Sequence, residues 1–269
     1  MEYIKHTIDE LKNKNVLVIS FSGMTPHLEA SIEIAIRLNK QNKVSFVHLG
    51  QFVSRPSVSS TAWLKRKFQL PIRAIKAEKY IKHNSNNQIR IINKLSLAKE
   101  VDNQFKEFTE KDFKNKITSF EDLKSLNYKG YNIGIGVGST LITYLSNSQP
   151  FPLNDFERKE CIEQVNSAMK SILFGELLLD QREFDTIVLL NGRLTCENAI
   201  KKVAYSQNIN VYFHERTYSN KRYFFEQYMP HTFDNRKKEI LRMKKEVSLN
   251  INNSIGDDFF KRKTQGEGV

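Results

Sequence analysis

Two short polar motifs in the second half of the sequence combine residue types that could carry chemistry. Asn191-Gly192-Arg193 and His214-Glu215-Arg216 each follow an apolar run. Glycine permits a sharp turn and close approach by a ligand, and arginine offers a planar fork for a phosphate or carboxylate. A glutamate between two cationic side chains is usually ionised, so Glu215 could deprotonate a hydroxyl or bind a sugar. The alternative interpretation of Asn191-Gly192-Arg193 is a structural turn with an ion pair. That of His214-Glu215-Arg216 is a buried ion-pair network that fixes the loop.

A third polar segment follows the first apolar run of the chain. Residues 15–20, Asn-Val-Leu-Val-Ile-Ser, are typical of a strand buried on both faces. Gly23 lies in the loop that follows, and Thr25-Pro26-His27 indicates a helix start. The positive end of the helix dipole would lower the pKa of His27, which would keep the imidazole neutral as a general base requires. A surface or capping histidine is the alternative.

The elements that must position these motifs form two β-α-β units. The first combines the strand over 15–20, the helix that begins at Thr25 and a strand over 44–49. The second combines strands over 185–190 and 210–213 with a helix over 197–206. In doubly wound sheets, ligands bind at the carboxyl ends of parallel strands. We therefore expect an α/β fold with a Rossmann-like parallel sheet flanked by helices, and the three polar segments at one edge of it.

The remaining sequence is less regular. We expect a single domain over 1–269, with an N-terminal helix over 2–13 and an irregular insertion over about 51–127. Gly134-Ile-Gly136-Val-Gly138 lacks the preceding strand and the spacing of a dinucleotide fingerprint, so close helix packing is the favoured interpretation.

Composition narrows the class of protein. The apolar share of 39% and the charged share of 27% are typical of a globular chain. The net charge of +12 favours anionic partners without choosing among them. The two cysteines, Cys161 and Cys196, match no metal or redox spacing, and the sequence has neither a long apolar run nor a signal peptide. We expect a cytoplasmic protein, and no metal site because Asp-x-Asp and His-Glu-x-x-His motifs are absent.

Four segments in order resemble a bacterial family of capsule and surface-polysaccharide glycosyltransferases. They are Tyr128-Lys-Gly-Tyr-Asn-Ile-Gly134, Asn191-Gly192-Arg193, His214-Glu215-Arg216 and Pro230-His231. The resemblance covers residues 128–235. It implies the acceptor-side, N-terminal domain of a GT-B enzyme, in which a second domain binds the nucleotide sugar and no metal or other cofactor is required. The sequence ends at residue 269, where that donor-binding domain would begin.

The resemblance implies transfer of a sugar from a nucleotide sugar to a hydroxyl of a glycan or lipid-linked acceptor. Glu215 or His27 would be the catalytic base. The residues expected to bind substrate are Gly23, Asn191, Gly192, Arg193, His214, Arg216 and His231, with Lys221 and Arg222 as additions to the same patch.

Two other functions stay open at this point. The chain could be a non-catalytic partner of a separate donor-domain protein, and without such a domain we expect it to be inactive. It could also be a basic nucleic-acid-binding α/β protein, although no basic-aromatic recognition motif or helix-turn-helix signal supports that class. Peripheral contact with the inner face of a membrane is compatible with either.

Overall fold

The computed structural model describes residues 8, 11–22, 27–53, 63–146, 150–180, 183–216, 223–230, 232–233, 237 and 240–241. Of residues 63–70 and Arg216, only the backbone belongs to this description. The chain divides into two compact units, Met1–Met229 and Pro230–Val269. None of the helices in the described ranges has the length and apolar character to cross a membrane.

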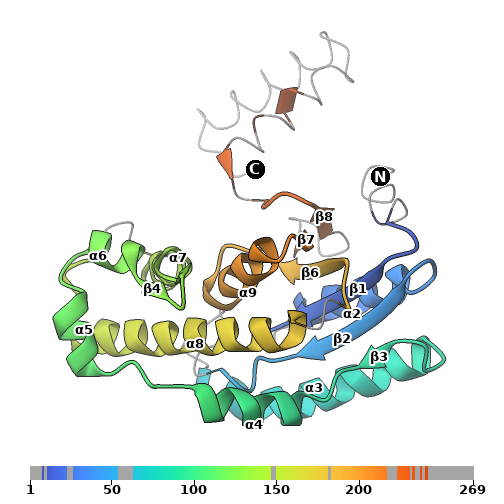
Figure 1. Cartoon of the computed structure of the whole chain (residues 1–269), viewed down its shortest axis with the longest axis horizontal. Helices are drawn as coiled ribbons and strands as arrows, with labels where there is room; N and C mark the ends of the chain where they lie inside the picture. The colour runs from blue at the N-terminus through green and yellow to red at the C-terminus, as the bar shows by residue number, and fades with distance from the viewer. Residues whose placement is uncertain are drawn as a thin grey trace, which may run out of the picture. The chain divides into compact units, whose positions relative to one another are not determined.

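A six-stranded sheet forms the centre of the first unit, in the order β3-β2-β1-β6-β7-β8. The first five strands along this order run parallel, and β8 pairs with β7 in the antiparallel direction. This arrangement, with helices on both faces, confirms the predicted α/β class (Figure 1). The strands are β1 (Asn15–Ser20), β2 (Lys43–His48), β3 (Arg90–Ile91), β6 (Thr186–Leu190), β7 (Asn210–Arg216) and β8 (Tyr223–Glu226).

Strand β1 contributes to two separate hydrophobic cores. Val16 and Val18 belong to one core, whereas Leu17 and Ile19 belong to the other. All four side chains are 0% exposed. Because successive side chains of a strand point to opposite faces, this run of apolar residues binds helices on both sides of the sheet.

Helices α2 and α9 place the two β-α-β units on opposite faces. Helix α2 (His27–Leu38) joins β1 to β2, and its Ile32 and Ala35 belong to the same core as Val16. Helix α9 (Thr195–Ser206) joins β6 to β7, and its Ala199 and Ile200 lie in the other core. The strand order departs in both directions from the β1–β6 pair, so this pair marks the topological switch point where doubly wound proteins bind ligands.

The segment predicted as an irregular insertion is mostly helical. It contains α3 (Trp63–Asn84), α4 (Lys94–Gln104), α5 (Glu110–Lys116) and α6 (Phe120–Ser125), and it adds β3 to the sheet. Helix α3 spans 22 residues and ends at Asn84. Buried Ala74, Ala77 and Ile81 recur at helical spacing and pack α3 onto the core. Their burial stabilises the helix although most of its other residues are polar.

Of the N-terminal helix predicted over 2–13, the described residues include Ile8 and Leu11. Both side chains are buried in the core beside α2, at 3% and 7% exposure. These two side chains therefore pack against the core on the α2 side of the sheet.

Two further helices of the described ranges pack on the α9 side of the sheet. They are α7 (Gly134–Leu145) and α8 (Asp155–Leu179), and a small hairpin of β4 (Asn127–Tyr128) and β5 (Tyr131–Asn132) precedes α7. Helix α8 lies alongside both α9 and α4 (Figure 1). Capping of α8 by Asn154, whose side chain accepts from the amide of Glu157, fixes where this long helix begins.

The glycines of α7 allow close packing, as the sequence predicted. A Cβ at Gly134 would lie 1.7 Å from the carbonyl oxygen of Leu123, and one at Gly136 would lie 2.8 Å from Cβ of Asn198. The segment forms helix rather than the strand-to-helix turn of a dinucleotide site.

Alanine substitutions within α7 test this packing. We expect Gly134→Ala to lower the free energy of unfolding by about 3 kcal/mol, because the new Cβ meets backbone that must move. Gly138→Ala is the matched control, since its Cβ would meet the Phe120 ring at 3.1 Å. The better helix propensity of alanine offsets that contact, so the control should stay within about 1 kcal/mol of the wild type. Equal stabilities in urea denaturation would contradict the packing argument.

Candidate functional site

The register of β6 and β7 brings the two polar motifs together. Leu190 pairs with His214, so the next residues, Asn191 and Glu215, lie side by side beyond the ladder. The side-chain amide of Asn191 donates a hydrogen bond to Oε2 of Glu215. Glutamate 215 therefore has one carboxylate oxygen held by the neighbouring strand end.

His27 approaches the same carboxylate from the start of α2. Its Nδ1 lies 4.0 Å from Oε1 of Glu215, and the two side chains are 20% and 17% exposed. Both groups are thus sheltered but reachable from solvent. The structure brings together the two residues that the sequence indicated as catalytic bases, although 188 positions separate them.

The Asn191-Gly192 turn has a conformation that these residue types favour. Asn191 and Gly192 both have positive φ, at 58° and 72°, which asparagine tolerates and glycine adopts without strain. A Cβ at Gly192 would lie 2.2 Å from the ring of Phe213, so no larger residue fits there. The amide of Arg193 donates to Oδ1 of Asn191 at 3.1 Å. This bond leaves Nδ2 of Asn191 directed at Glu215.

Two side chains of helix α9, which the sequence analysis did not identify, donate hydrogen bonds to this turn. Nζ of Lys201 donates to the carbonyl oxygen of Gly192 at 3.0 Å, and Nδ2 of Asn198 donates to the same oxygen at 3.3 Å. Burial lowers the pKa of Lys201 to about 8. Their spacing of three residues on the helix that follows the motif was the available signal, because it places both on one face.

Arg193 is partly buried beside the turn. Its Nε is buried and has no hydrogen-bond partner among the residues that the structure describes. A buried guanidinium nitrogen of this kind suits a phosphate or carboxylate group of a ligand.

His214 differs from the expectation that it binds substrate. It is 0% exposed, and its Nε2 lies 3.0 Å from Oγ of Ser31 on α2. The Ser31 hydroxyl donates to the carbonyl oxygen of His27 at 3.1 Å, so it accepts from His214. His214 therefore positions the start of α2, and with it His27, rather than facing a ligand.

A second buried histidine lies at the end of β2. Nε2 of His48 donates to the carbonyl oxygen of Ser22, 3.3 Å away, in the loop after β1. Desolvation lowers the pKa of His48 to about 4 and that of His214 to about 3. Both imidazoles are consequently neutral at physiological pH; His48 holds the loop after β1, and His214 holds the first turns of α2.

Several predicted site residues lie outside the described residues. They are Gly23, His231, Lys221 and Arg222, together with the side chain of Arg216. Across the described ranges, no group of three or more His, Cys, Asp or Glu side chains could hold a metal ion.

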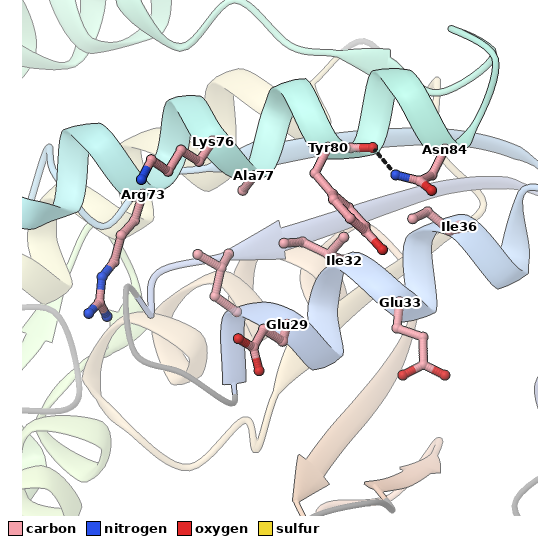
Figure 2. Close-up of a pocket in the computed structure, with 10 residues that line it drawn as sticks. Glu29, Ile32, Glu33, Ile36, Arg73, Lys76, Ala77, Tyr80 and Asn84 are labelled. Carbon is pink, nitrogen blue, oxygen red and sulfur yellow. Dashed lines mark hydrogen bonds between the residues drawn. The ribbon is translucent and has the colours of Figure 1, made fainter.

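A groove of about 890 Å³ lies between α2 and α3, and it contains none of the predicted site residues. Leu28, Ile32 and Ala77 form part of its apolar lining. Figure 2 shows Arg73 extending toward the start of α2 and Glu33 pointing away from α3. The groove begins one residue after His27, but the polar groups that could perform chemistry converge at Glu215 instead. We therefore assign the candidate site to the strand ends.

Comparison with known proteins leaves the family of the chain open. No family model matches the sequence, and no curated protein matches it. Among solved structures, the chain resembles a CDPS from Fluoribacter dumoffii with a TM-score of 0.37 and 14% identity, over 76% of this chain and 89% of that chain. A likeness this distant carries no functional argument.

The two buried histidines predict how stability depends on pH. The unfolded chain protonates each imidazole below about pH 6.5, whereas the folded chain keeps them neutral to about pH 4 at His48 and about pH 3 at His214. The contribution of the two neutral histidines to the free energy of unfolding should be complete above about pH 6.5. It should decrease as the pH falls, by up to about 1.4 kcal/mol per pH unit for each histidine.

Substitution of one histidine isolates its share of this slope. His214→Gln keeps a hydrogen-bond donor for Ser31. It should reduce the dependence of the unfolding free energy on pH, between pH 6 and pH 4, by about 1.4 kcal/mol per pH unit, which corresponds to one proton. The control His83→Gln changes an exposed histidine and should leave the slope as it is. Chemical denaturation at several pH values measures both, and an unchanged slope in His214→Gln would contradict the assignment.

Proposed function

We propose that this chain is the acceptor-side half of a GT-B glycosyltransferase that acts in surface-polysaccharide or lipid-linked glycan synthesis at the cytoplasmic side of the membrane. The observation that carries the proposal is the carboxylate of Glu215, held by Asn191 and 4.0 Å from His27 at the carboxyl ends of the strands. The ordered resemblance over residues 128–235 supports the same reaction class.

The reaction divides between this chain and a donor-binding half. A hydroxyl of the acceptor glycan would bind with its proton toward Glu215. As that oxygen attacks the anomeric carbon of the nucleotide sugar, the carboxylate accepts the proton and the nucleoside diphosphate leaves with the electrons of the broken bond. The nucleotide sugar is a substrate that the donor-binding half would hold, either on a longer chain or on a separate protein.

Three neighbouring groups fit supporting roles in this step. The amide of Asn191 orients the carboxylate of Glu215, and it does so without adding a proton-accepting group. Arg193, with its buried Nε, suits a phosphate or acidic sugar group of the acceptor or donor. His27 is placed to bind the same hydroxyl or to take the proton in place of Glu215.

Replacement of the proposed base gives the most direct test of the chemistry. In the enzyme that contains this chain together with a donor-binding half, Glu215→Gln should lower kcat by about 10²- to 10⁴-fold, because general-base catalysis is removed. Acceptor binding should change little, since glutamine can still accept a hydrogen bond. The control Glu33→Gln, on the exposed face of α2, should retain full activity. Unchanged turnover in Glu215→Gln would assign the base elsewhere.

Ligand binding by the chain alone tests the division of labour. In isothermal titration, we expect saturable binding of lipid-diphosphate acceptor analogues or acidic oligosaccharides and little affinity for nucleotides and nucleotide sugars. Arg193→Ala should lower the affinity for a phosphorylated acceptor by roughly tenfold or more, because a charge-assisted hydrogen bond is lost. The control Arg90→Ala lies at the far edge of the sheet and should not affect binding. Binding of DNA alone would contradict the proposal.

A further inference from the structure

Helix α3 presents an unusual outer surface. Its inner face, formed by Ala74, Ala77 and Ile81, is buried against the core. On its outer face, Ile72 and Ile75 are 57% and 51% exposed, although an outward face of a helix is normally polar. The helix therefore has a buried apolar inner face and, in addition, accessible apolar side chains on its outer face.

The same outer face is strongly basic. Lys76, Lys79 and Lys82 are exposed and follow one another at intervals of three residues. Within residues 71–84, the carboxylate that could balance them is Glu78, and it is already paired with Lys94 of α4. The described part of α3 thus combines exposed isoleucines with a row of exposed cations.

We propose that this surface, formed by Ile72, Ile75, Lys76, Lys79 and Lys82, binds the headgroup region of an anionic phospholipid bilayer. We call it the α3 surface. Amphipathic helices that lie on membranes place lysines against anionic headgroups and bury apolar side chains at the acyl boundary. The helix remains packed on the protein, and the outer side chains alone enter the interface.

The exposed isoleucines distinguish a bilayer from a polynucleotide. Lysines bind the phosphates of either partner. Aliphatic side chains gain nothing from a phosphate backbone, because single strands are held by aromatic stacking and duplexes by polar contacts. In a bilayer, the same side chains leave water, which adds to the affinity. The combination therefore favours the bilayer.

Vesicle co-sedimentation of the whole chain tests the proposal. The wild type should bind vesicles that contain phosphatidylglycerol and should not bind vesicles of phosphatidylcholine alone. The triple variant Lys76→Gln, Lys79→Gln, Lys82→Gln should bind about 100-fold more weakly, because each cation near an anionic surface contributes roughly fivefold. The double variant Ile72→Ser, Ile75→Ser should lose roughly tenfold.

Matched controls separate this surface from the general positive charge of the chain. The triple variant Lys14→Gln, Lys40→Gln, Lys111→Gln removes the same number of exposed cations from other parts of the chain and should retain most of the binding. Ile135→Ser removes an exposed isoleucine from α7 and should have no effect. Circular dichroism and melting temperature confirm that each variant is folded, as expected for substitutions on the surface.

Three results would overturn the proposal. They are failure of the wild type to bind the anionic vesicles, equal losses in the two lysine triple variants, and undiminished binding by the isoleucine double variant. If the isoleucine variant binds normally and a DNA duplex displaces the vesicles, the surface recognises polynucleotide instead. Since no sugar transfer is measured, these outcomes do not depend on the proposed function.

Discussion

The burial of β1 on both faces is the constraint on which the other elements depend. Because Val16 and Val18 contact one core while Leu17 and Ile19 contact the other, helices must cover both sides of the sheet. The two β-α-β units then extend in opposite directions from β1 and β6. The loops after these central strands consequently diverge at one edge, which leaves space there for polar groups.

The candidate site depends on that divergence and on the register of neighbouring strands. Asn191 meets Glu215 because β6 and β7 are parallel and aligned, and His27 meets Glu215 because α2 starts at the same edge. Behind these three residues stands a layer of buried polar contacts, in which His214 and Ser31 hold α2 while Lys201 holds the turn. A carboxylate held by the amide of Asn191 is oriented before any ligand arrives, as catalysis by positioned groups requires.

The central strands could be predicted from the sequence, because each shows one strong hydrophobic pattern. The apolar runs over 15–20 and 185–190 match β1 and β6 within one residue, because fully buried strands leave little ambiguity. Strand β7 continues to Arg216, beyond the predicted end at 213, because pairing with β8 keeps the motif extended. Strand β3 has two residues, Arg90 and Ile91, too few for a periodic signal.

The inner layer of the site could not be predicted because it depends on contacts distant in sequence. Alternation places His214 and Glu215 on opposite sides, but it does not say that His214 faces the Ser31 hydroxyl. A lysine in a helix is usually exposed to solvent, so the sequence gives no sign that Lys201 is buried. Its burial follows from how α9 packs against the Asn191-Gly192 turn. Fold class thus follows from local pattern, whereas the roles of single polar residues follow from tertiary packing.

The shortness of the outer strands has a consequence for behaviour in concentrated solution. At the two margins of the sheet, β3 offers two residues and β8 offers four. Unpaired amide and carbonyl groups on a long outer strand attract further strands from other molecules, which leads to aggregation. Margins this short give an incoming strand little to pair with, so the central parallel strands stay shielded from intermolecular β-sheet growth.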